Sequence, residues 1–203
     1  NLPVEQLAGH RSSTIRAFFK RIQDLVIGMA ALILLSPVFV LTALAVKLDS
    51  PGPIFFRQRR HGFHNEEILV WKFRSMRRET ADATASRQVT HGDDRVTRVG
   101  RFIRRTSIDE LPQLWNVLRG DMSLVGPRPP LCSEVARDTQ ADRERLDVTP
   151  GLTCIWQVSG RSDVPFPQQV EMDIAYIRQR SLATDVALLA RTVPAVIKGR
   201  GAY

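Results

Sequence analysis

Two adjacent acidic residues, Asp109 and Glu110, begin the segment DELPQLWNVLRG, whose apolar spacing predicts a helix. The N-terminus of a helix carries a partial positive charge, which favours ionised carboxylates and attracts phosphate groups. If Asp109 caps this helix, Pro112 falls in the first turn, where proline is tolerated. The pair is therefore a candidate acidic site beside a phosphate-attracting helix end.

The same residues also fit a purely structural role. Ser107 and Glu110 have the S-x-x-E spacing of a capping box, in which the glutamate side chain only returns a hydrogen bond to the backbone. Spacing by itself leaves both interpretations of Glu110 open.

Four basic residues are candidates for binding phosphate. Arg128 lies between two prolines that stiffen the backbone, and Arg161 follows a glycine. A guanidinium group offers planar paired donors that match phosphate oxygens. Lys72 and Arg74 occupy alternate positions of a predicted strand and share one face. For all four, an ordinary surface position is the alternative interpretation.

The chain as a whole is basic. Its 203 residues contain 29 Lys and Arg against 21 Asp and Glu, a formal charge of +8, which suits a partner that carries phosphate: nucleic acid, anionic lipid or a diphosphate.

The length predicts one main domain. Cys132 and Cys154 lack CxxC spacing and favour packing roles in a reducing compartment, and His61 and His64 lack the partners of a zinc site.

An apolar run from Leu25 to Val46 contains no charged residue and has the length needed to cross a bilayer. Pro37 removes one backbone donor and crowds the carbonyl of Ile33, so the helix must kink or break there. The freed carbonyl needs a partner within lipid, and the hydroxyl of Ser36 is one of the few local groups that can supply it.

Basic residues flank this run on both sides. They are Arg11, Arg16, Lys20 and Arg21 before it, and Lys47, Arg57, Arg59 and Arg60 after it. Because basic flanks favour the cytoplasmic face, both ends prefer the same side of the membrane. A bent hairpin that enters and leaves through one leaflet meets this preference. A kinked transmembrane helix and a buried helix of a soluble core remain as alternatives.

The remaining residues predict an α+β, mainly helical fold. Residues 53–76 form two apolar and aromatic runs around a Gly and Asn turn, the pattern of a β-hairpin, and residues 79–94 are small and polar, as in a loop. Residues 166–197 have helical periodicity.

Two shorter segments also predict helices. Residues 95–105 combine an apolar stripe with arginines, a pattern typical of a helix lying flat among lipid headgroups, although calmodulin targets and nucleic-acid binders look similar. In residues 109–119 the spacing places four apolar side chains on one face. They are Leu111, Leu114, Trp115 and Leu118.

Several motifs in order make the sequence specific. They are KRIQD at 20–24 before the Ser36-Pro37 run, then KFRSM, TSIDELPQLWNVLRGDMSLVGPRP, GLTCIWQVSGRSD and the terminal VPAVIKGRGAY. From about Lys20 to Tyr203 the chain resembles the bacterial monotopic phosphoglycosyl transferases, the polyprenyl-phosphate sugar-1-phosphate transferases that begin exopolysaccharide or O-antigen assembly. One departure is His64-Asn65, where the family often has glycine at the turn.

The resemblance implies a fold and a reaction. Residues 1–19 would be a lead-in, and 20–203 one catalytic domain whose re-entrant membrane helix, about 20–48, breaks at Ser36-Pro37. The active site would face the cytoplasm at the bacterial inner membrane. There the enzyme would use UDP-sugar, Mg²⁺ and undecaprenyl phosphate, bind membrane phospholipids and release UMP. The family includes dimers, so a homodimer is a further possibility that the resemblance raises.

The resemblance also assigns roles. Asp109 would be a nucleophile that forms an acyl phosphate, and Glu110 would hold Mg²⁺, a hard cation that prefers carboxylate and diphosphate oxygens. The basic residues fall into two groups. Arg128, Arg161, Lys72 and Arg74 would bind substrate phosphates, and Lys20, Arg21 and Arg104 would contact lipid headgroups. Asp24 is expected to pair with a basic residue near the mouth of the hairpin.

Two other functions compete with this interpretation. A nucleic-acid-binding protein would fit the charge, but interleaved exposed aromatic residues are lacking and Leu25–Val46 stays unexplained; we expect no nucleic-acid partner. A non-catalytic basic scaffold on the membrane surface would keep the hairpin but would not need Asp109-Glu110. The overall resemblance favours a hexose donor such as galactose or glucose.

Overall fold

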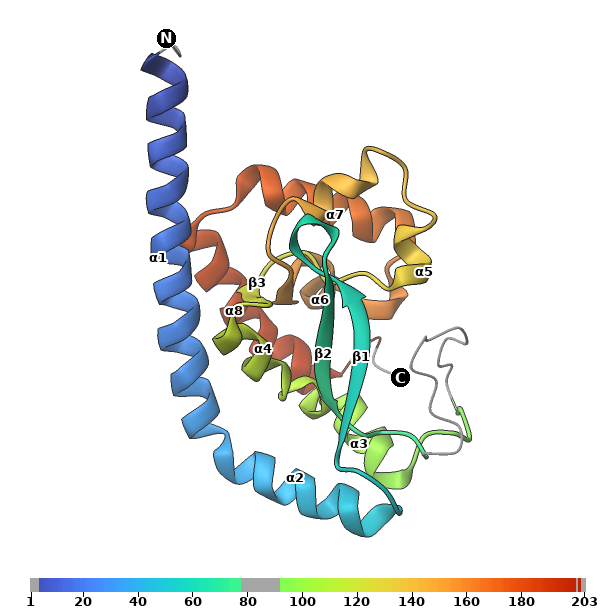
Figure 1. The fold of residues 1–203 in the computed structure, drawn as a ribbon. Coiled ribbons are helices and arrows are strands. Elements are labelled where there is room, and N and C mark those ends of the chain that lie inside the picture. Colours follow the sequence, from blue (N-terminus) through green and yellow to red (C-terminus); the bar gives the residue numbers. More distant parts are fainter. Residues whose placement is uncertain (1–3, 78–91, 200, 202–203) are drawn as a thin grey trace.

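The computed structural model describes residues 4–77, 92–199 and 201. Helices surround two short two-stranded sheets (Figure 1). The α-helices are α1 (Val4–Leu34), α2 (Ser36–Asp49), α3 (Arg98–Arg105), α4 (Gln113–Arg119), α5 (Cys132–Val135), α6 (Ile155–Ser159), α7 (Phe166–Gln179) and α8 (Leu182–Lys198). The strands are β1 (Phe55–His61), β2 (Glu67–Phe73), β3 (Ser123–Val125) and β4 (Gly151–Thr153), and single 3₁₀ turns include η3 (Ile108–Glu110) and η5 (Arg161–Asp163). The mainly helical α+β fold with a small hairpin is thus confirmed.

Helices α1 and α2 meet at a bend of 59° (Figure 1). Pro37 lies in the first turn of α2, and the Ser36 hydroxyl donates a 2.8 Å hydrogen bond to the Ile33 carbonyl, as predicted. No single helix in the described part of the chain is long and apolar enough to cross a membrane, whereas the bent pair passes that test together. Helix α1 is continuous through residues 19–20, so the lead-in and the domain share one helix.

The predicted β-hairpin is confirmed, with β1 antiparallel to β2 and Gln58 opposite Val70. At its turn His64 and Asn65 have φ values of 52° and 64°, in the left-handed region that favours glycine. Asn is among the residues that tolerate this region best.

The parallel pairing of β3 with β4 was not predicted. Ser123 stands opposite Gly151, and a β-carbon on Gly151 would lie 2.0 Å from the Gly126 nitrogen, so the two segments can approach only because this residue is glycine. The pairing places residues 126–129, which follow β3, next to residues 150–154. These two stretches form one wall of the candidate site described below.

Helix α4 differs from the prediction in its start and its face. It begins at Gln113 with Pro112 as the N-cap, so Asp109 lies one 3₁₀ turn earlier and does not cap it. Trp115 is 53% exposed, whereas Val117 is fully buried in the main core with Leu114. The buried Asn116 explains the shifted face, because its side chain bonds the backbone of β2 at Trp71 N (3.1 Å) and Leu69 O (2.8 Å).

Helix α3 joins α2 and β2 in a second small core of Val46, Phe73 and Ile103. It begins three residues later than predicted, after Thr97, whose side chain accepts a hydrogen bond from Gly100 N (2.9 Å). Phe102 of its apolar stripe is exposed. Most of the polar segment predicted at 79–94 lies outside the described residues.

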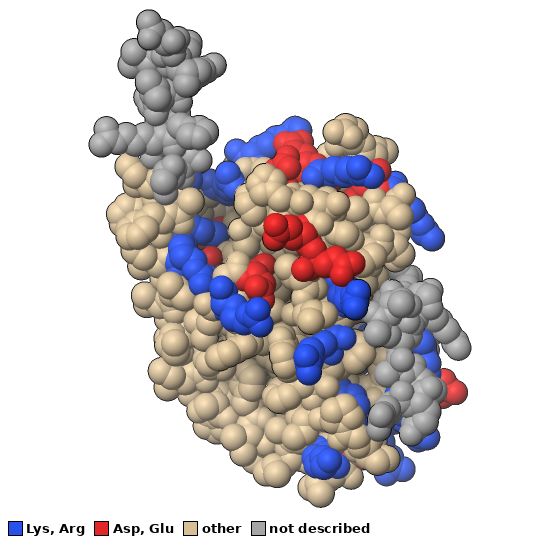
Figure 2. Space-filling view, in the orientation of Figure 1, with Lys and Arg blue, Asp and Glu red and all other residues tan. Residues whose placement is uncertain are grey.

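The segment predicted to be helical at 166–197 consists of two helices, α7 and α8. They are separated at Arg180-Ser181, where the Ser181 hydroxyl caps α8 by accepting from Thr184 N (3.0 Å). In the space-filling view the face along α1 and α2 is mostly uncharged, whereas acidic and basic residues gather on the rest of the domain (Figure 2).

Candidate active site

The two acidic residues lie in the single turn η3, directly before α4. Ser107 adopts a left-handed conformation (φ 54°), and its side chain makes no capping hydrogen bond. The Ser107 carbonyl does make a hydrogen bond to this turn, because it accepts from the Glu110 amide at 3.1 Å. The capping-box interpretation of Glu110 is therefore wrong, and the glutamate side chain points to other partners.

Glu110 accepts hydrogen bonds from two cations. Its Oε1 lies 2.8 Å from Lys72 Nζ and 2.6 Å from Arg128 Nη2, and its Oε2 lies 3.3 Å from Arg128 Nη1. Burial alone would raise the pKa of Glu110, but the charges and hydrogen bonds of Arg128 and Lys72 outweigh it and hold this pKa well below its ordinary value. Glu110 is thus a fixed anion.

Asp109 is in a contrasting environment. It is only 6% exposed, and its carboxylate makes no hydrogen bond or ion pair with any residue in the described part of the chain. Burial, followed by the charge of Glu110, raises the pKa of Asp109 to about 6. A carboxylate that is poorly solvated and unpaired is more reactive than one tied up by hydrogen bonds, so Asp109 is the better candidate nucleophile.

Asp109 and Glu110, which we call the dyad, open onto a cavity of about 300 Å³ between η3, the β3–β4 region and α8, the dyad cavity. Most of the predicted site residues line it. They are Lys72, Arg104, Asp109, Glu110, Arg128 and Arg161. Four cations around two carboxylates match a diphosphate substrate, since its negative charges need neutralising donors.

The stiff segment around Arg128 is held by a residue that sequence reasoning missed. The buried Arg60 of β1 donates to the Pro129 carbonyl (2.6 Å) and to the Gln58 side chain. Burial, together with the nearby charge of Arg128, lowers the pKa of Arg60 to about 10. On its other side the Arg128 guanidinium lies 5.8 Å from the ring centre of Trp156. In the sequence Arg60 looks like one more basic flank residue, and no local signal separates it from Arg59.

Arg161 and Gln157 form the opposite wall. Arg161 has φ 56°, a conformation rarely adopted by a residue other than glycine, and the next residue, Ser162, donates from its amide to Gly201 O (3.3 Å). Arg161 Nη1 and Gln157 Oε1 are buried without a hydrogen-bond partner among the described residues. Such atoms are few in native proteins, and in a cavity they indicate a ligand that supplies the missing partners.

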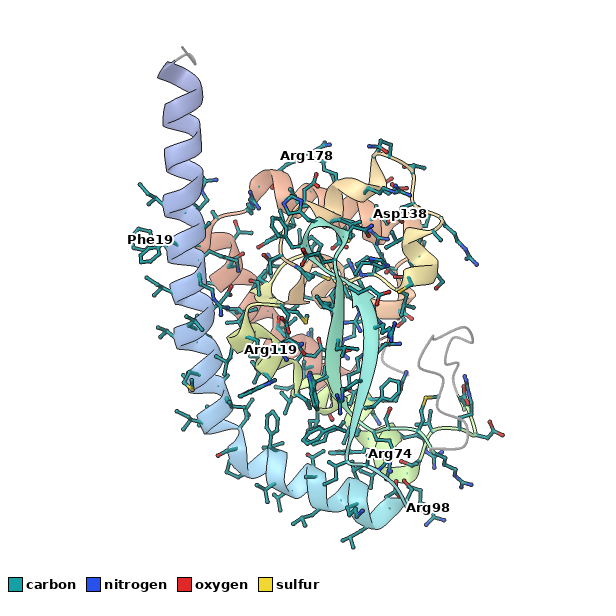
Figure 3. All side chains as sticks on the ribbon, viewed as in Figure 1. Phe19, Arg74, Arg98, Arg119, Asp138 and Arg178 are labelled. Carbon is teal, nitrogen blue, oxygen red and sulfur yellow. The ribbon has the colours of Figure 1, made fainter. Side chains whose placement is uncertain are left out.

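Arg74 does not join this cluster. It is buried and donates to the carbonyls of Val46 (3.1 Å), Ser50 (2.6 Å) and Pro51 (2.9 Å), at the end of α2 (Figure 3). Arg74 lies one residue beyond the end of β2, and its long side chain turns toward α2, where carbonyls at a helix C-terminus lack partners. Its contacts give it a structural role in place of the predicted phosphate binding.

Lys20 and Arg21 also make contacts within the domain. Lys20 Nζ lies 2.7 Å from Asp185 and 3.3 Å from Asp24, which confirms the expected pairing of Asp24 with a basic residue. Arg21 donates to the carbonyls of Val117 (2.6 Å) and Leu118 (2.8 Å), at the end of α4. These two residues lock α1 against α4 and α8, and the predicted headgroup contacts would compete with these bonds.

The dyad has limited but sufficient capacity for Mg²⁺. The described residues contain no cluster of three or more acidic, His or Cys side chains. Mg²⁺ is commonly held by one or two carboxylates plus substrate phosphates, so two are enough. A carboxylate has about four lone-pair positions, and Glu110 uses three of them for Lys72 and Arg128. Asp109 and the remaining position on Glu110 are the carboxylate ligands that the site offers to such an ion.

Comparison with known proteins identifies the family of this chain. Residues 15–199 match the family described as bacterial sugar transferase. This chain belongs to that family. The bacterial sugar transferase is 41% identical over 210 residues to the UDP-glucose:undecaprenyl-phosphate glucose-1-phosphate transferase of Escherichia coli (strain K12), covering 100% of this chain and 45% of that protein.

Two further relatives show the range of lengths. The Exopolysaccharide production protein ExoY of Sinorhizobium fredii is 39% identical over 199 residues, covering 91% of this chain and 88% of ExoY. The Undecaprenyl-phosphate galactose phosphotransferase of Salmonella typhimurium is 39% identical over 216 residues, covering 100% of this chain and 44% of that protein. The bacterial sugar transferase thus spans less than half of some relatives and most of another.

Proposed function

We propose that this bacterial sugar transferase moves a sugar-1-phosphate from a UDP-sugar to undecaprenyl phosphate and releases UMP, as the first membrane step of exopolysaccharide or O-antigen synthesis. The observation that carries this proposal is the contrast within the dyad: Asp109 is unpaired at a cavity, while Glu110 beside it is held by Lys72 and Arg128. The named activities of the relatives support the same substrate classes.

The reaction proceeds in two displacements. A carboxylate oxygen of Asp109 attacks the sugar-linked phosphorus of the UDP-sugar, the bond between this phosphorus and the bridging oxygen breaks, and UMP leaves with that oxygen. A phosphate oxygen of undecaprenyl phosphate then attacks the same phosphorus and breaks its bond to Asp109. The lipid diphosphate sugar leaves and the carboxylate is regenerated.

The basic residues around Asp109 neutralise the crowded anions during both steps. Arg128 and Lys72 are fixed by Glu110, so they need no rearrangement when negative charge develops. Arg161, on the opposite wall, has a buried unpartnered donor available for a phosphate oxygen. A bound Mg²⁺, held by Asp109 and Glu110, would further neutralise the diphosphate.

The acceptor lipid needs an apolar path to the dyad, and a groove of about 510 Å³ between α2 and α3 offers one. Its lining is almost wholly apolar and includes Leu41, Phe102 and Ile108, the residue directly before the nucleophile. Arg104 of α3 also lines the dyad cavity. We propose that the polyprenyl chain lies in this groove with its phosphate near Arg104.

The same surface supports a re-entrant position in the cytoplasmic membrane of a bacterium, with the site on the cytoplasmic face. Large apolar side chains along α1 and α2 are exposed. They include Val26, Ile33, Leu34, Val40, Leu41, Leu44 and Leu48. Exposed apolar residues on α3, α4 and α8, namely Phe102, Trp115, Val193 and Ile197, would rest at the interface. The predominantly uncharged face in Figure 2 fits this placement.

The test is a UMP-release assay on the purified chain with Mg²⁺, undecaprenyl phosphate and UDP-glucose or UDP-galactose. The proposal expects UMP release with at least one donor, dependent on the lipid acceptor for multiple turnovers. Absence of UMP with either donor, from protein that is folded and reconstituted in lipid, would contradict it. A panel of further UDP-sugars then identifies the preferred donor.

A further inference from the structure

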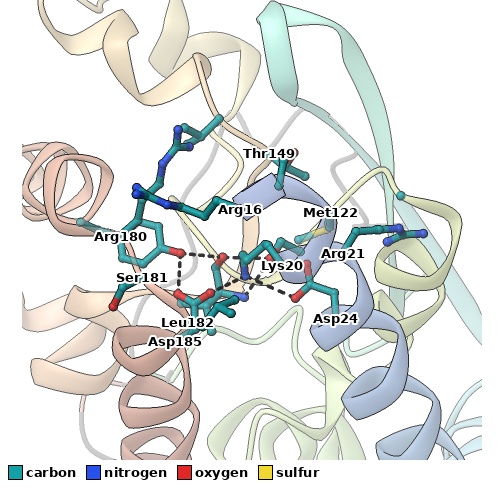
Figure 4. A pocket seen from close by; sticks show the side chains of 16 residues that line it. Arg16, Lys20, Arg21, Asp24, Met122, Thr149, Arg180, Ser181, Leu182 and Asp185 are labelled. Atoms are coloured by element: carbon teal, nitrogen blue, oxygen red, sulfur yellow. Dashed lines mark hydrogen bonds and ion pairs between the residues drawn. The ribbon is translucent and has the colours of Figure 1, made fainter. Parts of the chain in front are cut away.

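A second cavity, of about 420 Å³, lies between α1, the α7–α8 junction and the end of β3 (Figure 4). None of its lining residues lines the dyad cavity. Four basic residues, Arg16, Lys20, Arg21 and Arg180, and two acidic residues, Asp24 and Asp185, contribute to its lining. The cavity is therefore positive overall, which favours an anionic ligand.

The floor of this cavity is built from buried polar groups that satisfy one another. Asp185 accepts from the Tyr176 hydroxyl (2.7 Å) and pairs with Lys20, which also pairs with Asp24. Asp24 in turn accepts from the Leu124 amide (3.1 Å). Lys20 is thus shared by the two carboxylates, and the other cations that line the cavity are paired with neither of them.

Those cations are Arg16 on α1 and Arg180 at the start of the α7–α8 junction, whose side chains lie at the same side of the cavity in Figure 4. Neither guanidinium makes a hydrogen bond or an ion pair with a residue in the described part of the chain. Both residues are exposed, so their charges are available to a ligand at the mouth of the cavity. Phosphate oxygens match their paired donors.

The N-terminus of α8 adds further donors at the same place. Ser181 and Leu182 line the cavity. Ser181 accepts from the Thr184 amide through its hydroxyl and from the Asp185 amide through its carbonyl. The first-turn amides of Leu182 and Ala183 have no intrahelical partner, and the helix dipole is positive at this end. Helix N-termini of this kind bind phosphate.

We propose that this cavity is a second phosphate-binding site, distinct from the dyad, in which Arg16, Arg180 and the N-terminus of α8 hold a phosphate ester. Its position suits a phospholipid headgroup. The first exposed large apolar side chains among the described residues of α1 are Ile15, Phe18 and Phe19, next to Arg16, so a lipid whose chains contact them would bring its headgroup to this cavity. A soluble phosphate has the same chemistry.

The test measures ligand-induced shifts in Tm for the full chain in a neutral detergent. One arm titrates inorganic phosphate against chloride at equal ionic strength, and the other titrates dihexanoyl-phosphatidylglycerol below its micelle concentration. A ligand that binds only the folded protein raises Tm in a saturable way. The variant is Arg16→Gln with Arg180→Gln, and the matched control is Arg119→Gln with Arg178→Gln, two exposed arginines outside the cavity.

We expect at least one probe to raise Tm, with an apparent Kd about tenfold weaker in the Arg16/Arg180 variant and unchanged in the control, because charge-assisted hydrogen bonds are lost. A response to the lipid alone identifies a headgroup site, and a response to both identifies a general phosphate site. Equal responses in all three proteins, or none in the wild type, would overturn the proposal. UMP release at saturating substrate should stay the same in both variants. The Tm measurement therefore tests this site separately from the proposed activity.

Discussion

Arg128 binds Glu110 through both terminal nitrogens of its guanidinium, at 2.6 and 3.3 Å, and so holds one acid of the dyad as a fixed anion. Lys72 completes the arrangement from β2. The neighbouring Asp109 makes no such contact with a described residue and keeps an unpaired carboxylate at the cavity. The division of roles between two adjacent acids therefore comes from their partners, since their positions in the chain are almost the same.

Replacing Glu110 tests whether it orders the site. In Glu110→Gln the neutral amide no longer fixes Lys72 and Arg128, so we expect UMP release to fall on the order of 100-fold, the scale seen when one preorganised donor of a transition state is lost. Tm should also fall, because two partly buried cations lose their anion. The control is Glu67→Gln, which removes the exposed pair with Arg59 and should change neither value. Near-normal activity in Glu110→Gln would show that Glu110 does not order the site.

The paired geometry of Arg128 gives a second prediction. Lysine keeps the charge but has a single ammonium in place of the planar fork. Arg128→Lys should therefore lower kcat by about 10- to 100-fold, because the single ammonium positions the reacting groups less well. Steady-state UMP release at several donor concentrations measures this. If Arg128→Lys retained full kcat while Arg128→Gln lost it, charge alone would explain the role of this residue.

Arg74 should matter for stability and little for catalysis. Arg74→Met keeps the aliphatic stem but leaves the carbonyls of Val46, Ser50 and Pro51 without their donor. Unsatisfied buried acceptors cost about 1–3 kcal/mol each, so Tm should fall by several degrees. The KM for the UDP-sugar, measured on the folded fraction, should stay within about twofold. A large rise in KM at normal Tm would instead support the phosphate-binding role predicted from the sequence.

Asp173 should make stability depend on pH. This α7 residue is buried, and burial raises its pKa to about 7, against the opposing charges of Arg145 and Arg128. Between about pH 4 and pH 7 the folded protein then binds a proton that the unfolded chain releases. The contribution of this group to the free energy of unfolding is thus fully present below about pH 4 and is lost as the pH rises through 7.

Asp173→Asn imitates the protonated acid and should flatten this dependence, with a higher Tm than wild type at pH 8 and a smaller difference at pH 5. The matched control is Asp147→Asn, at an exposed aspartate. Thermal unfolding at the two pH values measures both. A wild-type Tm difference between the two pH values that Asp173→Asn leaves unaltered would contradict the assignment.

Local physical rules explain which structural features were predictable. The Ser36 bond to Ile33 O, the hairpin and the helices could be predicted because each depends on residues within a few positions of one another. The roles of Lys20 and Arg21 could not be predicted. Lys20 pairs with Asp185 and Arg21 donates to carbonyls of α4, and these partners are about 100 or more residues away in the chain. The β3–β4 pairing and the support of Arg128 by Arg60 are long-range in the same sense.

Mass spectrometry of the intact protein tests the central claim, that Asp109 is the nucleophile, most directly. Incubation with a UDP-sugar and Mg²⁺ but without lipid acceptor should add the mass of one sugar phosphate to the chain and release up to one equivalent of UMP. Peptide mapping should place the adduct on Asp109, and Asp109→Asn should show neither adduct nor UMP release. An adduct on another residue, or undiminished UMP release by Asp109→Asn, would contradict the account.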